Sequence, residues 1–530
     1  RAGLPTLGAM RTMGGMGRPG RPWLSRARGT LVGALGLALL AVATLPTAGC
    51  RLSSAPARQT APDWLAGAGV RKITPDLGDP GRPVYVGGLE RGLKASGIHD
   101  DLFARALVLT DVGGASVGLV VLDLIGFFHD DVEAIRGQLK AAHPEVRLAH
   151  LAVASTHTHA GPDVIGLWTP IGGSVDDAYM SFVRAEAVEA IAGAWRSRRP
   201  AVMTVGVSTA PGLAVDTRLP EVIDESVLAM GLKDASSGQG IASLVNWNSH
   251  PSVSGGENSL ISADFPWAVV ARMEREWGGT ALYASGALGG QIGSGRVKIQ
   301  DPQTGEKPKD RMKRAALIGD RVARIALDAL ASSASGGSGA AATGRVEAEP
   351  AIRVKSETLY VPMDNPRFAR GLSIGLLRPR RLYPLDGDGP GRLPSELSDP
   401  SSLKAGQYSL RTEVAAIDLG EAVWALIPGE LYPELALGRV QRPQDPGSDF
   451  QGAPAEPALR AMSDKPVFLI GLANDELGYL VPMSQWDEAP PFAYGRDEPQ
   501  YGERNSVGPR TAAMVMRAFD VVFAGFQGTE

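Results

Sequence analysis

A chain of 530 residues, 44% of them apolar, can bury one large core or two ordinary ones. Its formal net charge is −4 and it has no basic run of five or more residues, which makes nucleic acid a poor candidate partner. Cys50 is the only cysteine, so the chain can form no intrachain disulfide and offers no set of thiolate ligands. A bound metal would therefore need histidine, carboxylate, tyrosine or backbone oxygen ligands. The 66 glycines and 6% aromatic residues favour a loop-rich α/β protein over a helical bundle.

The first 49 residues have the composition of an export signal. A basic stretch at 18–28 precedes an apolar run at 31–45 that is short for a membrane span, and Thr47-Ala48-Gly49 precede Cys50. We favour a lipoprotein signal peptide at 1–49 with lipidation of Cys50; the alternative is an ordinary signal peptide with an incidental cysteine. The chain would then be exported to a bacterial cell envelope and lipid-anchored, or otherwise periplasmic or secreted. Cleavage would remove six arginines and no acidic residue, so the net charge would change from −4 to −10.

Strands and helices alternate along the rest of the chain. A polar tether at 50–63 precedes a predicted hairpin of strands at 107–110 and 117–122, a helix at 130–142 with Asp130 and Glu133 as a capping pair, and a strand at 148–154. Then follow a helix at 176–197, a strand at 241–246, a helix at 266–276, a strand at 280–284 and a helix at 309–332.

The second half continues the same alternation. Its composition predicts a flexible linker at 332–343, a hairpin of 412–419 and 421–427 turning at Gly420, a strand at 467–472 and a final helix at 514–523. The basic segment at 367–381, whose charges gather at 378–381, is interpreted as a solvated loop. The expected fold is α/β, with mixed β-sheets flanked by helices in a single large catalytic domain at 64–530.

A histidine pair marks the end of the predicted strand at 148–154. The motif Ser155-Thr156-His157-Thr158-His159-Ala160-Gly161-Pro162 holds two of the seven histidines in the chain, and its Gly-Pro forces a turn. Two imidazoles at a broken strand end can build a metal site or an acid/base site. Taken alone, the pair is better explained as loop histidines satisfied by backbone hydrogen bonds, because the spacing is short and common.

Three further polar residues follow predicted strand ends. His250, Glu430 and Tyr479 follow the strands that end at 246, 427 and 472. Because ligands of α/β sheets bind beyond the carboxyl ends of strands, these side chains and the histidine pair are expected to converge on a zinc centre. Individually they could be a loop cap, a helix N-terminal acid and a rim residue.

In order and spacing these motifs resemble the neutral/alkaline ceramidases, specifically their N-terminal catalytic domain. The resemblance spans roughly the whole mature chain and includes the segments at 66–75, 97–100, 102–107, 156–162, 246–250, 428–430, 474–479 and 501–503. The most specific of these is the segment at 156–162.

The resemblance implies one zinc ion per chain, bound by His157, His250, Glu430 and Tyr479. It places His159 and Tyr501 beside the metal, around the scissile bond, with His159 passing a proton to the leaving amine. The implied reaction is hydrolysis of a linear amide in a lipid-like substrate, N-acylsphingosine, to a sphingoid base and a fatty acid.

The sequence departs from the family pattern at three points. Ile292 falls near the place of a family serine, and Ser294 is close by but shifted. Arg218 is a weak match to the arginine that lines the family's pocket. The sequence ends at Glu530, so no C-terminal immunoglobulin-like domain is expected. Two alternatives therefore stay open: a hydrolase of another amide or ester in envelope or scavenged lipids, and a non-catalytic lipoprotein of the same fold that binds a lipid or a partner.

Overall fold

Two mixed β-sheets form the centre of the computed structural model, which describes residues 64–334, 351–385, 389–399, 401 and 403–527. These residues fall within one compact unit, which agrees with the expected single large α/β domain. The expected signal peptide, Cys50 and the tether at 50–63 lie outside the described residues, as does the expected linker from residue 335 onward.

The first sheet has eight strands in the order β12-β10-β9-β8-β1-β4-β5-β6. Neighbours pair antiparallel except at its two ends, where β12 runs parallel to β10 and β6 runs parallel to β5. Its strands are β1 (Trp64–Lys72), β4 (Phe103–Asp111), β5 (Ser116–Leu122), β6 (His150–Ser155), β8 (Arg199–Thr209), β9 (Ser226–Asp234), β10 (Gly240–Trp247) and β12 (Thr280–Ser285).

The second sheet comes from the second half of the chain, in the order β13-β15-β16-β18 with β14 paired to β15. Its strands are β13 (Arg353–Pro362), β14 (Leu382–Tyr383), β15 (Ser409–Asp418), β16 (Val423–Leu426) and β18 (Val467–Ile470). Gly420, at φ 79°, lies in the turn between β15 and β16, as expected.

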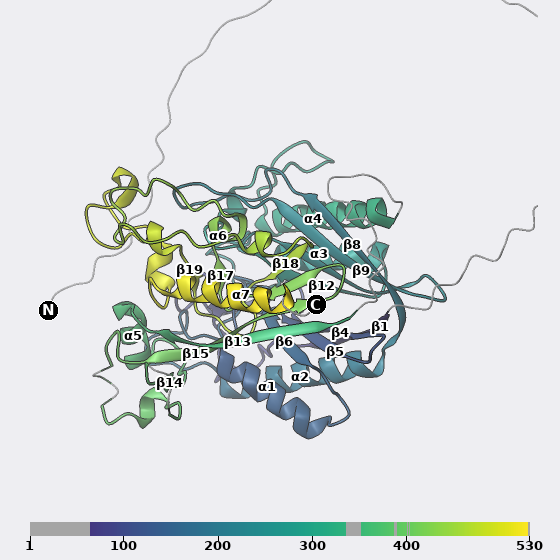
Figure 1. The fold of residues 1–530 in the computed structure, drawn as a ribbon, viewed down its shortest axis with the longest axis horizontal. Helices are drawn as coiled ribbons and strands as arrows, with labels where there is room; N and C mark the ends of the chain where they lie inside the picture. The colour runs from purple at the N-terminus through teal and green to yellow at the C-terminus, as the bar shows by residue number, and fades with distance from the viewer. Residues whose placement is uncertain (1–63, 335–350, 386–388, 400, 402, 528–530) are drawn as a thin grey trace, which may run out of the picture. The chain divides into compact units, whose positions relative to one another are not determined.

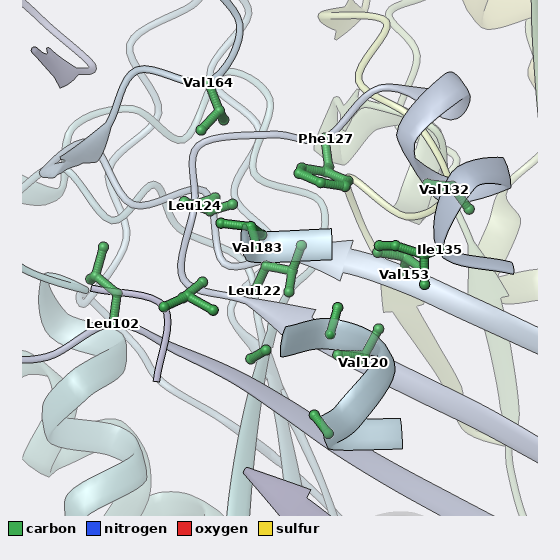
Figure 2. Close-up of a cluster of buried hydrophobic side chains, with 14 of the residues drawn as sticks. Leu102, Val120, Leu122, Leu124, Phe127, Val132, Ile135, Val153, Val164 and Val183 are labelled. Carbon is green, nitrogen blue, oxygen red and sulfur yellow. The ribbon is translucent and has the colours of Figure 1, made fainter. Parts of the chain in front are cut away.

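Alternating side chains divide the core into layers. Ile417 of β15 and Trp424 of β16 pack with Leu107 of β4 in a core between the two sheets. The opposite face of the first sheet packs against helices: Figure 2 shows Val120 of β5 and Val153 of β6 near Val132 of the first helix. The period of two along each strand thus produces four layers, helix, sheet, sheet and helix (Figure 1).

Seven α-helices cover or flank the sheets in the described parts of the chain. They are α1 (His129–Ala142), α2 (Asp177–Arg196), α3 (Phe265–Glu276), α4 (Arg311–Ala334), α5 (Pro366–Ser373), α6 (Pro433–Leu437) and α7 (Thr511–Gln527). The first four pack on the outer face of the first sheet, and α7 covers the second. No helix among these residues is both long enough and apolar enough to span a membrane.

Two expectations about α1 and its surroundings are wrong. Asp130 and Glu133 do not cap α1, because the helix begins one residue earlier and Asp130 accepts from the backbone of Arg381 instead. The segment at 378–381 is not simply a solvated loop: Arg378 forms an ion pair with the buried Asp131, and Arg380 is itself buried. Both guanidinium groups also stack near the Phe128 ring, so the segment is fixed to the domain.

Candidate metal centre

Loops from both sheets meet at the predicted site. His157 and His250 follow β6 and β10 of the first sheet, while Glu430 and Tyr479 follow β16 and β18 of the second. The two-residue strands β17 (Glu430–Leu431) and β19 (Tyr479–Leu480) pair in parallel with Glu430 directly opposite Tyr479. This pairing explains why two residues 49 positions apart in the sequence present their side chains together.

One carboxylate oxygen joins the two histidines. Glu430 Oε2 lies 2.8 Å from His250 Nε2 and 3.3 Å from His157 Nε2. The Tyr479 hydroxyl lies 3.4 Å from His250 Nε2. All four side chains are buried, so the structure brings together every residue that the resemblance implied as a metal ligand.

The hydrogen bonds around His157 indicate that these side chains fit a cation. His157 Nδ1 donates to the carbonyl of Ile125 at 2.5 Å, so that Nε2 is the ring nitrogen that can present a lone pair. That lone pair faces Glu430 Oε2, which is also an acceptor. Two buried acceptors in contact need a proton or a cation between them, and imidazole nitrogen with carboxylate oxygen is a donor set that zinc prefers.

Burial and charge give the metal-binding protonation states. Burial lowers the pKa of His250, although the carboxylate of Glu430 opposes it. For Glu430, burial acts to raise the pKa, but the imidazoles of His157 and His250 outweigh it and hold the pKa below its usual range. Lowered pKa values of an imidazole and of a carboxyl both favour the deprotonated forms that bind a metal ion.

His159 is the third imidazole at this place. Its Nδ1 donates to the carbonyl of Gly88 at 3.1 Å, and its buried Nε2 has no partner in the described parts of the chain. The ligand atoms of His157, His159 and His250 all lie within 4.8 Å of one another. His159 is thus close enough either to hold an ion or to exchange a proton beside it.

Gly88 is needed for this position of His159. A Cβ on Gly88 would lie 2.7 Å from the Cβ of His159, and the φ of 154° also disfavours a side chain. Burial and the two neighbouring imidazoles lower the pKa of His159 well below its usual value. The ring is therefore neutral, with its free lone pair at Nε2.

Tyr501 and Ile292 border the site on the side of Tyr479. The Tyr501 ring lies 5.8 Å from that of Tyr479, and its side chain is 60% exposed, as a residue at the rim of the site would be. Ile292 packs against the cluster that contains Tyr479. Ser294 is buried and hydrogen-bonds Ser252 at 3.0 Å, so the hydroxyl nearest in sequence is engaged elsewhere.

The structure gives Arg218 partners of its own. Its buried guanidinium pairs with Glu503 at 2.7 Å and donates to the carbonyl of Gln485. It also lies over the ring of Tyr432, whose ring is 5.8 Å from that of Tyr479. Arg218 therefore packs against Tyr432, which in turn lies beside Tyr479. A contact of Arg218 with substrate stays a prediction.

Sequence reasoning missed Glu476. This carboxyl is buried, and burial together with the charge of Glu430 raises its pKa well above the ordinary value. The adjacent Asp475 pairs with the buried Arg380 through both carboxylate oxygens, at 2.7 and 2.6 Å. The available signal in the sequence was the pair Asp475-Glu476, which ends three residues before the predicted ligand Tyr479.

Comparison with known proteins bears on the fold. The structure superposes on a crystal structure of neutral ceramidase from Pseudomonas aeruginosa with a TM-score of 0.62 and 18% identity, over 88% of this chain and 74% of that one. A structure of a ceramidase complexed with C2 gives a TM-score of 0.61 and 18% identity, over 88% of this chain and 75% of that one.

The chain shares the fold of neutral ceramidase. The resemblance expected from motif order is thus confirmed at the level of the fold. No protein-family model matches the chain, and no curated protein matches its sequence. The roles of the individual site residues stay predictions, which rest on the geometry described above.

Proposed function

We propose that the protein is a zinc-dependent hydrolase of a linear amide bond in a lipid-like substrate, of the neutral ceramidase type. The observation that carries the proposal is the convergence of two imidazole Nε2 atoms on one buried carboxylate oxygen, with a tyrosine hydroxyl beside them. The shared fold supports it, and N-acylsphingosine is the leading substrate, cleaved to a sphingoid base and a fatty acid.

His157, His250, Glu430 and Tyr479 would hold the ion. In that position a zinc ion would lower the pKa of a bound water molecule to near neutrality and would stabilise negative charge on the carbonyl oxygen. His159 is suited to move the proton, because its neutral ring presents a free lone pair at Nε2 while Gly88 holds Nδ1. It can accept a proton at Nε2 and deliver it to the nitrogen that leaves when the C–N bond breaks.

Ile292 favours a second candidate, a hydrolase of another amide or ester. Its aliphatic side chain packs against the cluster that contains Tyr479, and a serine near this place could have offered a hydroxyl to a polar head group. A site without such a partner discriminates poorly between polar substrates. A purely lipid-binding lipoprotein has less support, since it would not need four converging metal donors.

We also propose that the protein is exported and anchored through a lipid on Cys50. The basic stretch, apolar run and small residues before Cys50 support this proposal. The anchor would hold the domain near the lipids that it hydrolyses.

The test compares kcat/KM for N-acylsphingosine with that for an analogue lacking the head-group hydroxyl, before and after metal removal. We expect zinc-dependent cleavage of both, with a preference well below the roughly 10⁴-fold typical of sites built around a substrate hydroxyl. Cleavage that survives complete metal removal, or no amide cleavage by zinc-loaded protein, would contradict the proposal. A preference of about 10⁴-fold would instead show that another residue replaces the missing serine contact.

A further inference from the structure

The carboxyl of Glu476 is buried with one oxygen unsatisfied. Its Oε1 accepts from the backbone of Gly478 at 2.8 Å, while its buried Oε2 finds no hydrogen-bond partner in the described parts of the chain. Such a group costs folding free energy, because the atom loses its hydrogen bonds to water and gains none in the protein. An unsatisfied buried carboxyl beside a candidate metal centre therefore needs an explanation.

The surrounding chain holds Glu476 in this position. Arg380 donates to the carbonyl of Glu476 at 3.0 Å, and the Asp475 carboxylate accepts from its N–H at 2.8 Å. Gly126 leaves room for the side chain, because a Cβ there would lie 2.8 Å from Glu476 Cγ. Gly126 also directly follows Ile125, whose carbonyl orients His157.

One residue connects this carboxyl to the candidate ligands. Gly478 donates its N–H to Glu476 and accepts at its carbonyl from the N–H of Glu430, at 3.0 Å. Tyr479 comes directly after Gly478. The charge of Glu430 acts on the Glu476 carboxyl, which places the two acids in the same electrostatic environment.

The charge of the site supplies a reason for a second acid. A divalent ion bound by two neutral imidazoles, a neutral phenol and one carboxylate keeps an excess positive charge. An uncompensated charge is costly in a buried site. A bound cation favours the ionised form of a second carboxyl nearby, and the charge of that carboxylate then lowers the cost.

We propose that Glu476 is a positioning residue of the metal centre, which acts through Glu430 and its loop to raise the affinity of the site for a divalent cation. This inference rests on the proposed zinc site, but it concerns a residue outside the expected ligand set. Groups that support metal ligands in this way typically change metal affinity by about 10–100-fold when mutated.

Glu434 provides a matched control. It is also a fully buried glutamate with an unpartnered Oε2, and burial raises the pKa of this carboxyl to about 8. Its charged neighbours are Arg218 and Asp216, whereas the charge that acts on Glu476 is that of Glu430. Replacing it with glutamine tests the general effect of losing a buried acid.

The experiment titrates the metal-free full chain with zinc against a chromogenic chelator and compares Glu476→Gln, Glu476→Asp and Glu434→Gln with the wild type. We expect Glu476→Gln to weaken zinc binding about 10–100-fold, Glu476→Asp to retain part of that affinity, and Glu434→Gln to match the wild type. Circular dichroism confirms that each variant is folded. If Glu476→Gln does not fold, the zinc affinity of Glu476→Asp is compared with that of Glu434→Gln, and this comparison tests the inference instead.

Three results would overturn the inference. Unchanged affinity in the Glu476 variants would remove the role of this residue while leaving the zinc site intact. Equal weakening in the Glu434 control would reduce the effect to the general loss of a buried acid. A wild-type protein that binds no zinc would remove both the inference and the proposed function.

Discussion

Replacing Arg380 by methionine should strongly destabilise the domain. Its guanidinium makes two hydrogen bonds to Asp475 and one to the carbonyl of Glu476, and the two paired side chains are only 3% and 0% exposed. The variant would leave the Asp475 carboxylate buried without a counter-ion. Removing one partner of a buried ion pair costs about 3–5 kcal/mol, which should appear as a lower free energy of unfolding in urea.

The control is an exposed pair of similar geometry. Arg82 binds both carboxylate oxygens of Asp176 at 2.5 and 2.6 Å, but its side chain is 53% exposed, so Arg82→Met should change the free energy of unfolding far less than Arg380→Met does. The double variant Arg380→Met/Asp475→Asn should recover most of the loss, because no uncompensated charge remains. If Arg380→Met costs no more than Arg82→Met, the reasoning about this buried pair is refuted.

Three other outcomes are expected. His159→Ala should retain zinc but lose about 10²-fold or more in rate, measured by metal analysis and single-turnover kinetics; loss of zinc would make His159 a ligand. Burial raises the pKa of Glu434 from 4.5 to about 8, so the folded state keeps a proton that the unfolded state releases, and stability should fall as pH rises between these values. Glu434→Gln should therefore stabilise the protein by up to about 3 kcal/mol at pH 7 and little at pH 4.5, and equal Tm shifts at both pH values would refute this. Cys50→Ser should release folded, active protein from the membrane, and mass spectrometry showing an unmodified Cys50 in the mature wild type would argue against the anchor.

The strand ends, and the polar residues that follow them at the candidate site, were predictable because they depend on local sequence. The apolar run before His157 and the Gly-Pro after it mark a strand and its turn, and the structure places β6 and the loop there. The predicted helices and the two hairpins are confirmed for the same reason. The strands β1, β8, β9 and β13 were not predicted: β13 is mostly exposed or half-buried, and β1 and β8 also carry exposed residues, so their apolar pattern is weak.

Contacts between side chains from distant segments could not be predicted from the sequence. Arg378 and Arg380 form a local basic cluster in the sequence, which indicates a solvated loop, yet their partners Asp131 and Asp475 come from distant segments. The same limit applies to the four-layer packing of the two sheets, since no local pattern states which apolar faces meet. Glu476 belongs to this class, because its environment depends on the distant Gly126 and Glu430.

The zinc content of purified protein tests the central claim most directly. Mass spectrometry of metals should find about one zinc per wild-type chain and none in the folded double variant His157→Ala/His250→Ala, because that variant loses both imidazoles that converge on Glu430. Full zinc occupancy in that double variant would contradict the account.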